Sequence, residues 1–156
     1  KLAECRSSAL ASKEFVWPLR LASTEDSLLV CDCQESSLYN FSIGGAMAEL
    51  GHIFRPAGPA ETCHFNEVAV HMPSQRAYVL DDDSLRIIDL STMELISIVR
   101  DVDGGCGHDL AVYGDSVIMS QGDQLIVLDL DGNHLRSIRG EFERATPSPL
   151  LMTAST

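Results

Sequence analysis

Basic residues are scarce in this sequence. Only 11 Lys and Arg stand against 23 Asp and Glu among 156 residues, which gives a net charge of −12. Proteins that bind nucleic acids or anionic lipid surfaces neutralise phosphate groups with Lys and Arg. A chain with this excess of acidic groups is poorly suited to that task. We therefore expect neither nucleic acid nor a membrane surface as a partner.

Long apolar runs are also absent. The longest purely apolar stretches are a few residues, far below the roughly 18 that a membrane-spanning helix needs. No basic segment followed by an apolar stretch opens the chain, so no signal peptide is visible. The compartment stays open on these grounds, with a lean toward the cytoplasm. Because the first residue is Lys1 and not Met, we expect the chain to be part of a longer protein.

The five cysteines lack the spacing of a common zinc or redox motif, since they stand at positions 5, 31, 33, 63 and 106. An odd number cannot pair completely within one chain. We expect free thiols that pack as small apolar side chains, with a metal or redox site as the alternative. Cys31 and Cys33 are expected on the same face of a strand, because side chains alternate with period two.

The sequence does contain an internal repeat. Three segments carry the same order of four short strands separated by polar turns. The opening strands lie 49 and then 42 residues apart, and the third strands lie 47 and then 40 apart. The predicted strands are 19–21, 28–32, 38–42 and 48–53 in the first segment, 68–70, 77–81, 85–89 and 94–99 in the second, and 110–112, 117–120, 125–129 and 134–139 in the third.

A period of roughly 40 to 50 residues with four strands per unit is typical of β-propeller blades. Blades pack face to face, so their inner strands are buried on both sides and are apolar along their length. We therefore predict an all-β fold, a β-propeller fragment of three four-stranded antiparallel blades. The opening strands of Leu19, Val68 and Leu110 should be innermost. A β-sandwich of about 12 strands is the alternative.

The amino-acid sequence of the repeated units resembles that of the NHL-repeat family of β-propellers. Residues 77–81 (AYVLD) and 125–140 (LIVLDLDGNHLRSIRG) carry this resemblance most closely. It implies half of a six-bladed ring, with blades at 16–55, 56–100 and 101–140. Residues 1–15 would then be a linker or the end of a preceding blade, and 141–156 the start of a fourth. The sequence departs from the pattern at Ser120, where Asp32 and Asp81 predict an acidic residue.

The first strands of a propeller line its central channel, so residues just before them should ring one mouth of that channel. Aligning the units places Trp17, Asn66 and His108 at one position, which predicts contact with a ligand or partner. His64, Cys106 and His108 have the chemistry to bind a metal there, with zinc or calcium as the candidate ion. Propeller enzymes similar to NHL repeats, the amidating lyases, hold a metal with histidines from successive blades.

Carboxylates gather at Asp81, Asp82 and Asp83, between two predicted strands. We expect them to form the turn through hydrogen bonds to the backbone, with a calcium site as the alternative. No nucleophile elbow, H-E-x-x-H or phosphate-loop motif is present.

The function predicted from the sequence is a non-catalytic, NHL-like module for protein–protein interaction. The expected partners are another protein, and either the remaining blades of the same protein or a second copy. A metal-dependent propeller enzyme, a lyase or hydrolase with its site at the channel mouth, is the alternative.

Overall fold

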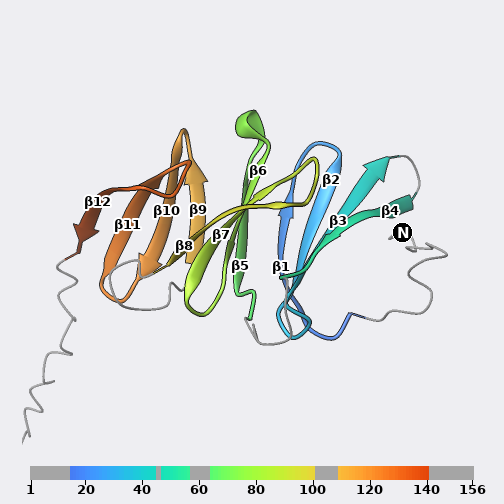
Figure 1. Ribbon diagram of the computed structural model, residues 1–156, viewed down its shortest axis with the longest axis horizontal. Coiled ribbons are helices and arrows are strands. Elements are labelled where there is room, and N and C mark those ends of the chain that lie inside the picture. The colour runs from blue at the N-terminus through green and yellow to red at the C-terminus, as the bar shows by residue number, and fades with distance from the viewer. Residues whose placement is uncertain (1–14, 45–46, 57–63, 101–108, 141–156) are drawn as a thin grey trace, which may run out of the picture.

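The computed structural model describes residues 15–44, 47–56, 64–100 and 109–140. Within them, twelve strands form three four-stranded antiparallel sheets, each with its strands in sequence order (Figure 1). The first sheet contains β1 (Pro18–Ser23), β2 (Ser27–Asp32), β3 (Ser37–Gly44) and β4 (Met47–Phe54). The second contains β5 (Glu67–His71), β6 (Arg76–Leu80), β7 (Ser84–Asp89) and β8 (Leu95–Arg100). The third contains β9 (Asp109–Tyr113), β10 (Ser116–Gln121), β11 (Gln124–Asp129) and β12 (His134–Arg139).

The three sheets stand side by side as the blades of an open arc (Figure 1). β1 contacts β5, and β5 contacts β9, so the first strand of each sheet lies on the inside of the arc. This confirms the predicted propeller fold and the predicted inner strands. The β-sandwich alternative is wrong, because a sandwich packs two sheets and the described residues form three.

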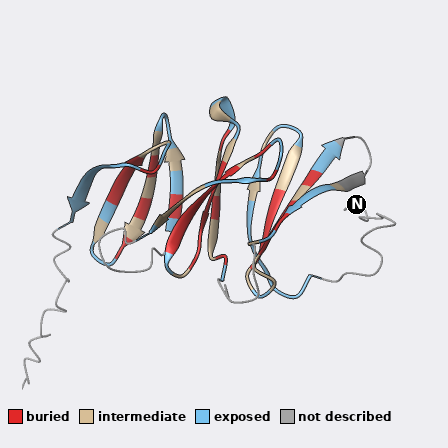
Figure 2. Ribbon diagram, viewed as in Figure 1, coloured by how far each residue is buried: buried red, intermediate tan, exposed pale blue. Residues whose placement is uncertain are grey.

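Apolar side chains fill the spaces between the blades. Leu29 and Cys31 pack with Val79 between the first and second blades. Tyr78 and Ile126 pack between the second and third blades. Burying one large apolar side chain stabilises a fold by roughly 1.5–3 kcal/mol, so these two layers hold the arc together. Figure 2 shows the buried residues concentrated in the middle sheet, whereas β12 is exposed along its whole length.

The length of one turn corrects the predicted alignment of the first blade. Ser23 pairs with Leu28 and Leu21 with Val30 around a short β1–β2 turn, whereas Val68 pairs with Val79 around a longer β5–β6 turn. Leu21, and not Leu19, is therefore the counterpart of Val68. A β-bulge between Pro18 and Arg20 then adds one residue at the start of β1, which the sequence period does not reveal.

A second correction concerns the position of Asp32 and Asp81. Ser120 pairs with Leu125, just as Leu80 pairs with Leu85, so Ser120 corresponds to Leu80. The following residue, Gln121, therefore stands where the other blades have their aspartates. Gln121 is buried, as Asp32 and Asp81 are.

The predicted blade boundaries remain predictions, and segments 1–14 and 141–156 lie outside the described residues. In the part of the chain that the structure describes, no helix is long and apolar enough to cross a membrane.

Candidate functional site at the inner rim

Side chains from the first two blades meet at the edge where β1 and β5 begin. We call this group the inner rim; it consists of Trp17, Cys33, His64, Asn66 and Asp82. Trp17 is held by its backbone, because its amide donates to the Asp32 carboxylate at 3.2 Å and its carbonyl accepts from the Cys33 amide at 3.0 Å. Trp17 is nevertheless 61% exposed. The fold thus presents a large aromatic side chain on a fixed segment of backbone.

Asp32 holds the segment that enters the first blade. Its carboxylate is fully buried and accepts hydrogen bonds from the amides of Val16 at 2.8 Å and Glu35 at 3.1 Å, in addition to Trp17. A carboxylate at the end of β2 therefore ties the entering chain to the β2–β3 turn. This is the structural reason for an aspartate at that position.

Asp82 organises the second blade's part of the inner rim. Its carboxylate oxygens lie 2.7 Å from His64 Nδ1 and 2.9 Å from Asn66 Nδ2, which donates to it. Burial alone would raise the pKa of Asp82, but the hydrogen bonds from Asn66 and His64 outweigh it and lower the pKa below its ordinary value. Asp82 is therefore a stable anion near neutral pH, and it orients both neighbours.

The two blades touch at Cys33. Its thiol lies 4.0 Å from Asn66 Oδ1, so Trp17 and Asn66 belong to one continuous rim although they come from different blades. Burial, followed by the charges of Asp82 and Asp32, raises the pKa of the Cys33 thiol. A thiol held in its protonated form is a poor nucleophile and a poor metal ligand.

Cys31 belongs to the core rather than to the inner rim. It is free and fully buried, and burial raises the pKa of its thiol far above the ordinary value. Cys31 thus packs as a small apolar side chain, as expected from the sequence.

The candidate metal ligands are only partly described. His64 lies on the inner rim and is exposed, while Cys106 and His108 lie outside the described residues. No group of three His, Cys, Asp or Glu side chains within the described ranges is placed to share a metal ion. The zinc or calcium hypothesis stays a prediction.

The three consecutive aspartates form a turn rather than one cluster. Asp81 is buried and accepts from the amide and hydroxyl of Ser84 and from Arg86 Nε at 2.7 Å. Asp82 points to the inner rim, and the amide of Asp83 donates to Asp81 at 3.0 Å. The carboxylates of Asp81 and Asp82 therefore serve different partners, which confirms the prediction of a structural turn.

Sequence reasoning missed Cys33 and Asp82 as rim residues. Both follow a strand rather than precede one, so an alignment of strand entrances does not find them. The sequence pattern that could have found them is the turn after the second strand of each repeat. In the fold this turn lies next to the start of the first strand.

Comparison with known proteins supports the fold. No protein-family model and no curated protein match the sequence. Solved structures do match. The chain is similar to U3-55K, with a TM-score of 0.70 and 11% identity, over 82% of this chain and 41% of that one. It is similar to the hydrazine synthase of Kuenenia stuttgartiensis, with a TM-score of 0.67 and 13% identity, over 88% and 40%. It is also similar to the WD40 repeats of RRP9, with a TM-score of 0.70 and 12% identity, over 88% and 44%.

At 11–13% identity these likenesses show the fold alone. The chain is a partial β-propeller, built from three four-stranded antiparallel blades. It matches about two fifths of the length of each of these structures.

Proposed function

We propose that this chain is a non-catalytic protein-interaction module, and that the inner rim contacts the partner. The observation that carries the proposal is the exposed indole of Trp17 on a fixed backbone. Aromatic side chains, and Trp in particular, supply a large share of the binding energy at protein interfaces. A soluble chain gains nothing for its own stability by leaving most of an indole in water.

The polar surroundings of Trp17 suit such a contact. Asn66 and Asp82 offer hydrogen-bonding groups on the same inner rim, and their mutual bond fixes their positions before a partner arrives. Interfaces combine a buried aromatic centre with a polar rim of this kind. Preorganised side chains lose little conformational freedom on binding, which favours affinity.

We further propose that the blades are of the NHL type. This finer assignment is supported by the sequence of the third blade, residues 125–140, and not by the solved structures, which match the propeller fold in general.

Site-specific photocrosslinking tests the proposed rim. A photoreactive phenylalanine analogue placed at Trp17 should cross-link to a partner protein in cells. The same analogue at Leu135, which is 56% exposed on the outer strand β12, is the matched control and should not capture that protein. Equal capture at both positions, or capture at neither, would contradict the proposal.

A metal-dependent enzyme remains the second candidate because of the His64–Asp82 contact. A carboxylate bound to one imidazole nitrogen is the arrangement that orients a histidine whose other nitrogen ligates a metal. This candidate predicts stoichiometric zinc in the purified protein and its loss in the His64→Ala variant. An absence of metal from wild-type protein prepared without chelators would exclude it.

A further inference from the structure

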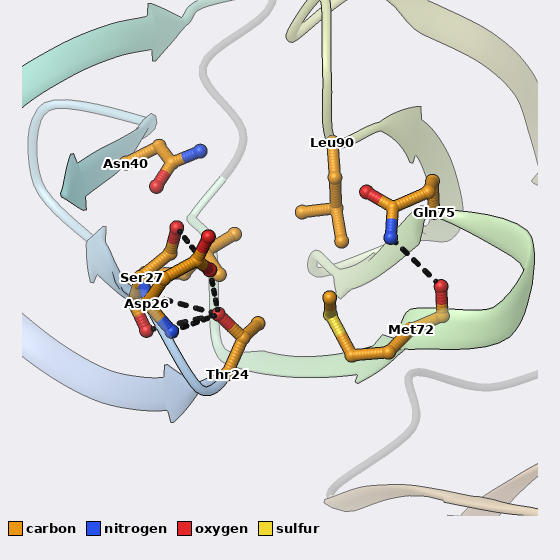
Figure 3. Close-up of a pocket in the computed structure, with 8 residues that line it drawn as sticks. Thr24, Asp26, Ser27, Asn40, Met72, Gln75 and Leu90 are labelled. Atoms are coloured by element: carbon orange, nitrogen blue, oxygen red, sulfur yellow. Dashed lines mark hydrogen bonds between the residues drawn. The ribbon is translucent and has the colours of Figure 1, made fainter. Parts of the chain in front are cut away.

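A second candidate site lies on the edge opposite the inner rim. A pocket of about 180 Å³ opens between the first and second blades (Figure 3). Its walls come from the β1–β2 turn and β3 of the first blade, and from the β5–β6 turn and Leu90 of the second. Pockets for whole small molecules occupy roughly 300–1,000 Å³, so this one has the size for a single side chain.

The pocket offers hydrogen-bond acceptors. Asn40 Oδ1 is buried and has no hydrogen-bond partner among the described residues. Asp26 contributes a carboxylate, whose Oδ1 accepts from the hydroxyls of Thr24 at 3.0 Å and Ser27 at 3.3 Å. No Lys, Arg or His is among the described residues that line the pocket. A cationic donor would therefore find acceptors here and no repulsion.

The corresponding place between the second and third blades is filled by an arginine. Arg76 begins β6, and its Nη1 donates to the carbonyl of Leu130 at 2.8 Å and to Asp131 at 2.7 Å. The hydroxyl of Tyr78 donates to the same carbonyl at 3.0 Å. A guanidinium and a phenol from the second blade thus occupy the space next to Leu130 of the third.

The first blade lacks both of these side chains. Ser27 begins β2 as Arg76 begins β6, and Leu29 stands where Tyr78 does. Leu90 follows β7 as Leu130 follows β11. The pocket therefore corresponds to the space that Arg76 fills between the second and third blades. Between the first and second blades the shorter side chain of Ser27 leaves this space open.

Asn40 is also an exception among the blades. The pairing of Leu38 with Cys31 and of Leu85 with Leu80 makes Ile87 its counterpart in the second blade. Ile87 is fully buried in the apolar layer between blades. The fold thus takes an apolar residue at this position, and a buried acceptor without a partner lowers stability. A polar residue that the fold does not need is expected where a ligand uses it.

We propose that this pocket binds an arginine side chain of a partner protein. The guanidinium takes the place that Arg76 holds between the second and third blades, with Asn40 Oδ1 and the Asp26 carboxylate as acceptors. Its five N–H donors suit a site lined by oxygen atoms, and its aliphatic stem suits Leu90 and Met72. The inference rests on the proposed function in one respect, namely that the ligand belongs to a protein.

Titration of short peptides tests this site directly. The probes are acetyl-Gly-Arg-Gly-amide, its citrulline analogue, which keeps the shape without the charge, and its lysine analogue. NMR of the full chain should show the arginine peptide shifting the side-chain amide signals of Asn40. The Asn40→Val variant should bind on the order of tenfold more weakly, since a hydrogen bond to a charged group is lost. The same variant should melt at a higher temperature, because the unpaired buried acceptor is gone.

A second variant fills the pocket from within. Ser27→Arg places the arginine of the second blade in the first, so it should block the peptide and raise the melting temperature. Ser116→Arg, the same substitution at the start of β10, is the matched control and should leave peptide binding unchanged.

Several results would overturn the proposal. These are equal binding of the arginine and citrulline peptides, wild-type affinity in Asn40→Val, or unhindered binding in Ser27→Arg. Equal affinity for the lysine peptide would overturn the guanidinium assignment. Cross-linking through Trp17 does not depend on Asn40, so failure here and failure of the proposed function give different results.

Discussion

Arg86 and Asp81 form an ion pair inside the middle blade. Arg86 Nε donates to Asp81 Oδ2 at 2.7 Å, and the two side chains are only 5% and 3% exposed. Removing one partner of a buried pair leaves an uncompensated charge and costs about 3–5 kcal/mol. We predict that Arg86→Met lowers the free energy of unfolding by about that amount, measured by urea denaturation.

An exposed pair provides the control. Arg20 and Glu67 are also 2.7 Å apart, but the Arg20 side chain is 45% exposed. Exposed pairs contribute about 1 kcal/mol or less, so Arg20→Met should have a small effect. Equal losses in the two variants would contradict the assigned role of burial.

Gly132 is required by both its backbone and its surroundings. Its φ is +86°, and a Cβ at this position would overlap Val99 Cγ2 of the neighbouring blade. Gly122 also has a positive φ, +58°, but faces open space. We predict that Gly122→Ala costs about 1–2 kcal/mol for the left-handed backbone alone. Gly132→Ala should cost about 1–3 kcal/mol more because of the clash. Thermal unfolding measures both, and similar losses would contradict the contact with Val99.

Stability should fall in acid because of Asp129. Hydrogen bonds from the side chain and amide of Asn133 and from the Asp131 amide lower the pKa of Asp129 in the folded state. A carboxyl with a lowered folded pKa stabilises the fold above its unfolded pKa of about 4, and this stabilisation is lost as the pH falls through the folded pKa. Asp129→Asn should therefore reduce the difference in melting temperature between pH 6 and pH 2. An unchanged difference would contradict this role.

The outward face of the third blade should promote self-association. Leu125 and Ile138 are paired neighbours on this face and are 43% and 44% exposed. Exposed apolar sheet faces associate in water. Sedimentation of the full chain should show oligomers, and Leu125→Glu should reduce them. Leu95→Glu, a change at a 41% exposed leucine of the middle blade, is the control. A monodisperse wild-type monomer would contradict the prediction.

The blade architecture could be predicted from the sequence, because the same order of apolar strands and polar turns occurs in all three repeats. The apolar run around Val79 is typical of a strand that is buried on both faces, and in the structure Tyr78 and Val79 pack into the two different layers between blades. The bulge at Pro18 and Arg20 could not be predicted in this way, because one extra residue changes no hydrophobic pattern. The shorter β1–β2 turn displaces Trp17 from its predicted alignment with Asn66, and the bulge restores only part of that displacement, although both residues lie on one rim.

The pocket between the first and second blades could not be predicted from the sequence. It arises where the repeats differ from one another, not where they are alike. Ser27 and Leu29 are ordinary strand residues when the first blade is read alone. Only the register of the second blade, with Arg76 and Tyr78 at the same places, reveals the space that they leave. Asn40 could not be recognised from the sequence either, since an isolated Asn in a strand carries no signal until its Oδ1 is known to be buried without a partner among the described residues.

Binding of a protein at the inner rim can be measured directly through Trp17, because it is the only tryptophan in the chain. Its fluorescence in the free protein should have the emission of an exposed indole and be quenched readily by acrylamide. Adding the purified protein captured through position 17 should shift the emission to shorter wavelength and protect it from quenching. An unchanged emission maximum and unchanged quenching at saturating partner would contradict the account.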